Sequence, residues 1–378
     1  MNHTKRKLAY DVIRIIGCAL VVLVHVSGSV YESSRLGGSD FMIGNIYNVM
    51  GIVGVPLFVM LSGALLLHSG REISTGAFLR NHCLKILLLF WLTLFSYNLW
   101  HYCRGEVTDI AGTLQTCEEY SFGTFWEYVL IRTLSCVGIG CGHLWYLPMI
   151  LVLYLLTPLM RRTFDDRKAC RYYLVIFCVV GVLWNTALQF DLPYKRIVSS
   201  IRNTFDLGAF CGYAGFYVLG HYITEYTSKP GRGRWIAAIL GIPAGIGFTV
   251  CLDYIRSMGA GRAVSTFNNP TMLGGFLAAG CTFYVLYHLI GVRKSNTKTA
   301  VVSGLTLGIY LIHPAVIELL EQWGLRATDV PSAVEIPVFT VLVFVVSAIP
   351  VALIRLSLHG ISCLFHTSAR SSGGDQAS

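Results

Sequence analysis

The stretch that decides the fold lies near the start of the chain and reads YDVIRIIGCALVVLVH, from Tyr10 to His25. Apart from Asp11, Arg14 and His25 it is apolar, as a membrane-spanning helix requires. Ionisable groups inside a span are costly and usually mark a site or a pathway. At about 100° per residue, Arg14 and His25 share one helix face, roughly 16 Å apart along the axis. Asp11 precedes Arg14 by three residues, a spacing that favours an ion pair.

The composition of the whole chain places it in a membrane. Of its 378 residues, 54% are hydrophobic and only 13% are charged, which is too apolar for a soluble globular protein of this size. Windows of about twenty apolar residues predict about ten membrane-spanning helices, so we expect an all-α, polytopic integral membrane protein. The predicted spans are 9–28, 43–67, 83–102, 144–160, 171–189, 207–222, 235–253, 270–290, 303–321 and 335–356.

The long connection between the third and fourth spans has features of its own. Its segment 122–142 is apolar but is interrupted by Glu127 and Arg132, so we expect an interfacial or re-entrant helix. The same connection holds four of the 12 cysteines, which leaves a disulfide and unpaired thiols as open alternatives; these are Cys103, Cys117, Cys136 and Cys141. No CxxC motif or zinc spacing occurs in the chain, so no metal is expected.

The distribution of Lys and Arg predicts the orientation. Connections on the N-terminal side hold about twice as many of them as the opposite connections, so we predict that both termini are cytoplasmic. The net charge of +9 then reflects orientation, and no nucleic-acid partner is expected. We predict a cytoplasmic segment at 1–8, one membrane domain at 9–357 and a cytoplasmic tail at 358–378 that loses order from about residue 367. Because Asp11 and Arg14 interrupt the first apolar stretch and its length suits a full span, we expect a membrane span there and not a cleavable signal peptide.

Four stretches spread over the chain form one recognisable set. They are Asp11-x-x-Arg14 followed by ten residues and His25, Val55-Pro56-Leu57-Phe58-Val59-Met60-Leu61-Ser62-Gly63, His143-Leu144-Trp145-Tyr146-Leu147-Pro148 running into Leu155-Leu156-Thr157-Pro158-Leu159, and Gly308-Ile309-Tyr310-Leu311-Ile312-His313-Pro314. Together they resemble the membrane acyltransferase-3 family. The resemblance implies a cell-membrane O-acyltransferase that moves an acyl group, by default acetyl, from cytoplasmic acetyl-CoA to a hydroxyl of a cell-surface or lipid-linked glycan.

The first span carries the residues expected to perform this chemistry. Histidine titrates near neutral pH, so His25, near the predicted outer end, can remove a proton from an acceptor hydroxyl as attack begins. Arg14 lies toward the inner end, where it can meet the thioester and pantetheine groups of the donor or hold a helix through Asp11. The candidate catalytic residues are therefore His25, Arg14 and Asp11.

The candidate donor-binding residues lie on the predicted inner side. Guanidinium and ammonium groups bind phosphate oxygens, and Arg71, Arg80 and Lys85 supply such groups before and at the start of the third span. The family often shows a longer basic run here. This chain has Asn81 and His82 instead, a departure that weakens the assignment of CoA phosphates to particular side chains.

The candidate acceptor-binding residues are polar and aromatic side chains on the predicted outer side, together with one histidine in the ninth span: Asn45, Asn48, His143, Trp145, Tyr146 and His313. Two of them have equally good structural explanations. His143 sits beside an aromatic belt, and His313 can instead bond a carbonyl that Pro314 leaves unpaired. We also expect Ser62-Gly63 to permit close helix packing and not to supply a nucleophile.

Two further alternatives stay open at this point. The acyl group can pass directly to the acceptor, or by way of a separate extracytoplasmic transferase, since no hydrolase-like domain follows the spans. Alternatively, the chain is a transporter of a glycan or small metabolite without acyl-transfer chemistry, because intramembrane Asp, Arg and His also line transport pathways. The absence of a visible internal repeat speaks against transport. The expected partners are membrane lipid, the acceptor and, in the relayed route, the separate extracytoplasmic transferase; the sequence indicates no oligomeric state.

Overall fold

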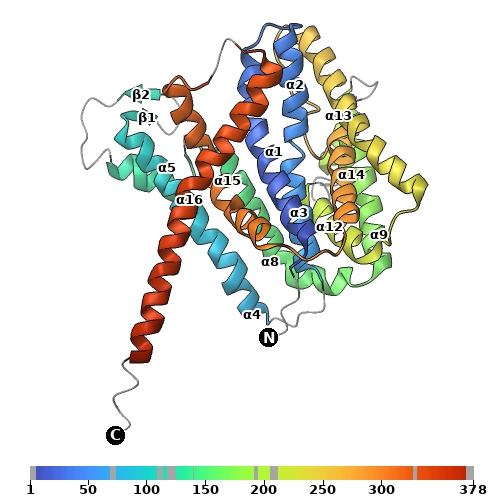
Figure 1. Cartoon of the computed structure of the whole chain (residues 1–378). Coiled ribbons are helices and arrows are strands. Elements are labelled where there is room, and N and C mark those ends of the chain that lie inside the picture. Colours follow the sequence, from blue (N-terminus) through green and yellow to red (C-terminus); the bar gives the residue numbers. More distant parts are fainter. Residues whose placement is uncertain are drawn as a thin grey trace. The chain divides into compact units, whose positions relative to one another are not determined.

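The computed structural model describes residues 6–68, 74–108, 114–116, 125–138, 140–190, 195–204, 212–326 and 330–371. These residues are almost entirely helical (Figure 1). Two short strands, β1 (Glu106–Thr108) and β2 (Leu114–Thr116), pair antiparallel. Within the described residues, nine helical segments are long and apolar enough to cross a membrane. The chain is thus an all-α, polytopic membrane protein, as its composition predicted.

The nine segments coincide with nine of the ten predicted spans. They are α1 (Leu8–Ser33), α2 (Ser39–Gly51) with α3 (Gly54–Leu66), α4 (Thr75–Phe78) with η1 (Leu79–Cys83) and α5 (Leu84–Cys103), η3 (Gly142–Trp145) with α8 (Tyr146–Phe164), α9 (Arg167–Ile176) with η4 (Phe177–Trp184) and α10 (Asn185–Ala187), α13 (Arg232–Ala260), α14 (Leu273–Ile290), α15 (Thr297–Gln322), and α16 (Ser332–Ser371).

The remaining predicted elements fall on short helices. The span expected at 207–222 corresponds to α12 (Tyr213–Tyr226), which has 14 residues; residues 205–211 lie outside the described part. The interfacial helix expected at 122–142 appears as η2 (Trp126–Ile131) and α7 (Arg132–Leu134). One more helix, α11, covers Lys195–Thr204. The last helix of the described chain, α16, runs from Ser332 to Ser371.

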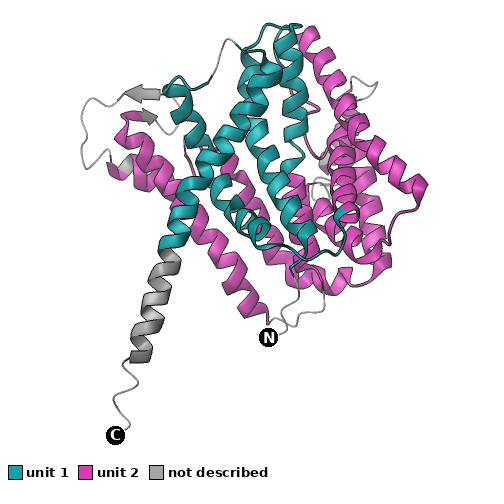
Figure 2. Ribbon diagram, viewed as in Figure 1, with its two compact units in different colours: residues 1–54, 261–263, 290–378 teal, residues 55–260, 264–289 magenta. Residues whose placement is uncertain are grey.

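The chain divides into two compact units (Figure 2). Unit 1 comprises residues 1–54, 261–263 and 290–378 and is built from α1, α2, α15 and α16. Unit 2 comprises residues 55–260 and 264–289 and holds the remaining helices.

Glycines allow α1 to pack closely against the end of α2 and the first residue of α3 in unit 1. A Cβ atom at Gly51 would lie 2.6 Å from the backbone nitrogen of Val24, and one at Gly54 would lie 2.6 Å from the carbonyl oxygen of Gly17. Real side chains cannot approach backbone so closely, so only glycine fits at these two positions. In a membrane, such small residues let helix backbones reach van der Waals contact, which drives helix association.

Backbone contacts set the helix directions within unit 1. Lys7, just before α1, forms an antiparallel bridge with Lys294, just before α15, and the amide of Leu8 donates to the carbonyl of Arg293 at 2.8 Å. At the opposite end, the side chain of Arg326 reaches the carbonyl of Val26. Helices α1 and α15 are therefore parallel. In this unit, the connections predicted for one side of the membrane lie at one end of the helices, and those predicted for the other side lie at the opposite end.

A glycine pair also joins two helices of unit 2. A Cβ atom at Gly63 of α3 would lie 1.8 Å from the carbonyl oxygen of Tyr217 in α12, and one at Gly220 would lie 1.9 Å from that of Met60. The backbones of α3 and α12 thus touch at both positions. The prediction that Ser62-Gly63 serves helix packing is confirmed for Gly63.

Candidate functional site

Two histidines from different helices meet in unit 1. The rings of His25 in α1 and His313 in α15 have centroids 5.0 Å apart, with their planes tilted by 51°. His313 is fully buried. His25 keeps accessible surface although protein atoms surround it closely, whereas Val26 and Ser27, which follow it in the chain, are buried. A histidine that is accessible and is also held against a rigid partner is suited to proton transfer.

The proline after His313 explains how the buried ring is oriented. Pro314 has no N–H, so the carbonyl of Tyr310, four residues earlier, receives no backbone hydrogen bond within α15. Nδ1 of His313 donates to this carbonyl at 2.7 Å. The structure therefore shows the structural bond that the sequence left as one of two alternatives. Because Nδ1 carries the proton in the neutral ring, Nε2 is the acceptor atom.

Asp11 has a different role at the beginning of α1. Its buried carboxylate forms an ion pair with Arg6, with Nη2–Oδ1 at 2.5 Å and Nε–Oδ2 at 2.7 Å. Arg6 also donates to the carbonyl of Ala300 in α15 at 3.2 Å. Helical spacing predicted Arg14 as a partner of Asp11; the structure shows in addition a pair with Arg6, which lies before the first turn of α1 and reaches forward along the helix to the carboxylate. The side chain of Arg14 is half-buried.

Asn48 of α2 supports α1 beside His25. Its Nδ2 donates to the backbone carbonyl of Val24 at 3.0 Å, and its side chain is buried. Asn45, one turn earlier on α2, is buried too. Both were predicted to contact the acceptor. The contact that the structure gives Asn48 is with the backbone of α1, which suits a residue that positions His25.

The other predicted acceptor residues belong to unit 2. His143 is buried and makes an edge contact with Tyr97, with ring centroids 5.5 Å apart. Tyr146 is buried and lies 6.2 Å from Phe58 by the same measure. Only Trp145 among the three is exposed, so it alone presents its ring to a ligand without rearrangement.

The predicted donor-binding residues also belong to unit 2. Arg80 on η1 and Lys85 on α5 are both exposed, as phosphate-binding side chains must be. Between them, His82 stacks on Phe78 with ring centroids 4.6 Å apart. Arg71 lies outside the described residues. Among those residues, no cluster of three or more His, Cys, Asp or Glu side chains has the arrangement of a metal site.

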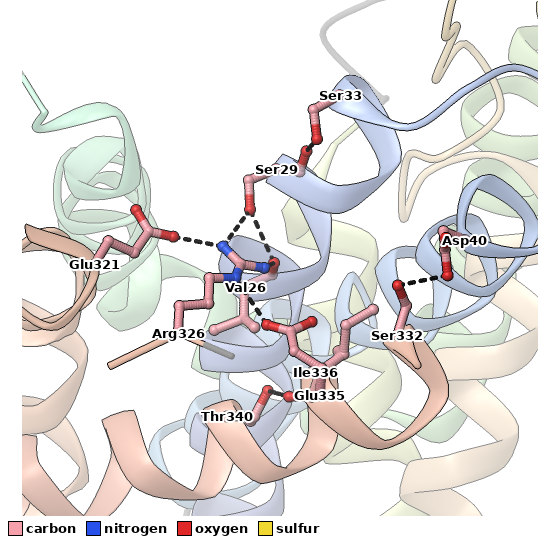
Figure 3. Close-up of polar contacts among 10 residues, drawn as sticks. All are labelled: Val26, Ser29, Ser33, Asp40, Glu321, Arg326, Ser332, Glu335, Ile336 and Thr340. Carbon is pink, nitrogen blue, oxygen red and sulfur yellow. Dashed lines mark hydrogen bonds and ion pairs between the residues drawn. The ribbon is translucent and has the colours of Figure 1, made fainter. Parts of the chain in front are cut away.

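The sequence did not single out a polar cluster around Arg326 in unit 1 (Figure 3). Arg326 donates through Nε to Glu335 at 2.7 Å and through Nη1 to the hydroxyl of Ser29 at 2.9 Å. Its Nη2 donates to the carbonyl of Val26 at 3.0 Å. It also forms an ion pair with Glu321. One guanidinium therefore connects α1, α15 and α16 next to His25.

A signal for this cluster is present in the sequence. Arg326 lies in a short connection between two apolar segments, and Glu335 opens the segment that follows. A carboxylate at the first turn of a span is costly without a cation, so its pairing with Arg326 could have been predicted. The contacts with α1 could not.

Comparison with known protein families identifies a match. A family model described as an acyltransferase domain matches residues 7–354, which is nearly the whole chain. The matched region includes both histidines of the pair and the Arg326 cluster. No curated protein and no solved structure matches the chain.

Proposed function

The chain belongs to the acyltransferase-3 family and is a multi-pass membrane acyltransferase; on this premise we propose that it transfers an acyl group, by default acetyl, from cytoplasmic acyl-CoA to a hydroxyl of a cell-surface or lipid-linked glycan. We place the enzyme in the cell membrane, with His25 as the general base. The observation that carries the proposal is the accessible ring of His25, held 5.0 Å from that of the buried His313.

The proposed step follows from this geometry. His25 accepts the proton of the acceptor hydroxyl as its oxygen attacks the thioester carbonyl. The new C–O bond forms as the C–S bond breaks, and the departing thiolate takes up the proton. General-base assistance of this kind contributes about 10²–10⁴-fold to a rate. We assign His313 to holding the ring of His25 in position, since the two rings are in contact.

The donor is assigned to the predicted inner side of the membrane. The exposed Arg80 and Lys85, with Arg71, provide positive charge for the phosphates of CoA. Arg14 lies between that side and His25 on the same helix, where a guanidinium can polarise the thioester carbonyl. Direct transfer is the simpler route, and relay through a separate extracytoplasmic transferase is its alternative.

The first test is transfer of radiolabel from acetyl-CoA in inverted membrane vesicles. We expect wild type to label a glycan or lipid-linked fraction, and His25→Ala to lose at least about 100-fold of the rate while it still binds acyl-CoA. His68→Ala is a matched control, since His68 forms an exposed ion pair with Glu225, and its rate should stay within twofold of wild type.

Two outcomes would overturn this assignment. Transfer that survives in His25→Ala at the wild-type rate removes His25 as the base. Wild-type vesicles that neither transfer label nor bind acyl-CoA saturably indicate a transporter, which has no need of the donor.

A further inference from the structure

We propose that a hollow beside Arg326, at the end of α1 that follows His25, binds the acceptor as a neutral polyol such as an uncharged sugar ring, and that it rejects anionic acceptors. This inference rests on the function proposed above, because it names the class of acceptor for the same reaction. It concerns a site whose residues all belong to unit 1.

The hollow has the size and lining of a small polar binding site. Its volume is about 270 Å³, close to the lower end of ligand pockets, which begin near 300 Å³. Its walls are Val30, Val330, the ion pair of Arg326 with Glu335, and the three serines Ser29, Ser33 and Ser332. The valines can contact the apolar face of a sugar ring while the polar groups bind its hydroxyls.

The guanidinium of Arg326, which lines the hollow, cannot bind an anion in bidentate fashion. Arginine has five N–H donors, and four of those of Arg326 already point to Glu335, Ser29, Glu321 and the carbonyl of Val26 (Figure 3). One donor remains. The parallel pair of N–H groups that binds a phosphate or a carboxylate in bidentate fashion is therefore not available.

The other polar atoms of the wall accept hydrogen bonds. Ser33 donates its own hydroxyl proton to the carbonyl of Ser29 at 2.7 Å, and Ser332 donates its proton to Asp40 at 2.8 Å. The lone pairs of both hydroxyl oxygens remain for a ligand. Oε1 of Glu335 accepts from Arg326, and no donor in the described part of the chain contacts Oε2. The hollow is therefore complementary to a ligand with several O–H or N–H donors.

The charge around the hollow also opposes an anion. Arg326 is matched by two carboxylates, those of Glu335 and Glu321, so the cluster carries one excess negative charge. Asp40, which accepts from Ser332, adds another acidic group. Like charges brought together in a partly desolvated site repel each other strongly.

The hollow lies about one helical turn beyond His25 on α1, since Ser29 is one of its lining residues. Ser29 follows His25 by four residues, so the two share one face of α1 with an axial separation of about 6 Å. A ring that fills the hollow can present one of its remaining hydroxyls to His25, while its other hydroxyls donate to the serine oxygens and to Glu335.

The test measures sugar binding without any acyl donor. The purified full chain in detergent is titrated with methyl hexopyranosides and with the corresponding methyl hexopyranosiduronates, followed by saturation-transfer NMR. We expect saturable binding of a neutral glycoside and binding of its uronate weaker by at least about tenfold. Ser33→Ala and Ser332→Ala should each lower the affinity for the neutral glycoside about fivefold, as expected for one lost hydrogen bond.

A matched control lies on α16. Ser357 donates to a backbone carbonyl of its own helix at 3.0 Å, as Ser33 does, but it is exposed and far from the hollow. Ser357→Ala should bind the glycoside as wild type does. Three outcomes would each overturn the proposal. They are equal affinity for the neutral and anionic probes, no saturable binding of any neutral glycoside, and serine variants that bind the glycoside as wild type does.

The result separates this inference from the proposed function. If the chain binds a glycoside through these serines but transfers no acyl group from acetyl-CoA, the binding role of the hollow is supported and the proposed acyl transfer is overturned. Transfer that depends on His25, without any change of acceptor KM in Ser33→Ala and Ser332→Ala, removes the hollow and leaves the acyltransfer step in place.

Discussion

An ion pair formed by an arginine stabilises each end of α1. The two pairs differ in how buried the arginine is and in how far apart the paired residues lie in the sequence. At the first end, Arg6 has a side chain that is 48% exposed, and it pairs with Asp11, which is 2% exposed and only five residues away, so it is the arginine that differs in burial between the ends. At the other end, Arg326 is 16% exposed and pairs with Glu335, which is 7% exposed.

This difference shows how one type of interaction can serve two purposes. The Arg6–Asp11 pair is local and closes the start of α1 against α15 through the carbonyl of Ala300. The Arg326 cluster draws on three helices and leaves a hollow beside it. The local pair holds a helix end in place, whereas the cluster of three helices shapes a surface that a ligand can contact.

The largest effect on stability is expected from Arg326→Ala. The variant leaves the buried carboxylate of Glu335 without its cation, which costs about 3–5 kcal/mol. Thermal unfolding in detergent should show a clear loss of stability. The double variant Arg326→Leu/Glu335→Leu should recover most of it, since an apolar pair of similar size replaces the buried charges. A single variant that unfolds at the wild-type temperature would contradict this account.

A smaller effect is expected from Arg6→Ala. Water can reach the site once the half-exposed guanidinium is removed, so the cost to unfolding should be about 1–3 kcal/mol. Arg6→Lys keeps the charge but not the two parallel hydrogen bonds to Asp11, and it should lie between wild type and Arg6→Ala in the same unfolding assay. If Arg6→Ala is as unstable as Arg326→Ala, burial does not distinguish the two ends.

The smallest effect is expected from Asn48→Ala, between the two ends. It removes one hydrogen bond to the carbonyl of Val24, worth about 1 kcal/mol. The acyl-transfer rate should fall by a larger factor than acyl-CoA binding changes, because the bond holds α1 next to His25. Equal losses in transfer and in donor binding would mean that Asn48 does not position His25.

Several features of the fold follow from local sequence. The nine spans are visible as apolar windows because lipid solvation acts on each helix separately. The motif around His313 likewise showed a histidine directly before a proline, and the missing N–H of Pro314 made the bond to Tyr310 foreseeable. Gly63 belonged to a segment predicted to pack closely, and its contact with Tyr217 confirms it.

The partners of the charged residues were harder to foresee. Helical spacing favoured Arg14 for Asp11, but Arg6 reaches the carboxylate from outside the helix. Helical spacing identifies neighbours only among residues of the same helix, and Arg6 lies before α1 begins. For Arg326 the sequence showed only a charge in a connection, whereas its contact with Ser29 joins residues 297 positions apart.

Hydropathy and proline geometry are local properties, so the sequence was enough to predict a helical membrane protein, the positions of its helices, and the motifs that contain His25 and His313. The contact between the two histidine rings, the pairing of Asp11 with Arg6, and the joining of three helices by Arg326 beside a hollow became visible in the folded structure. Such contacts depend on which helix faces pack together, and the apolar surfaces that choose those faces look alike in a single sequence.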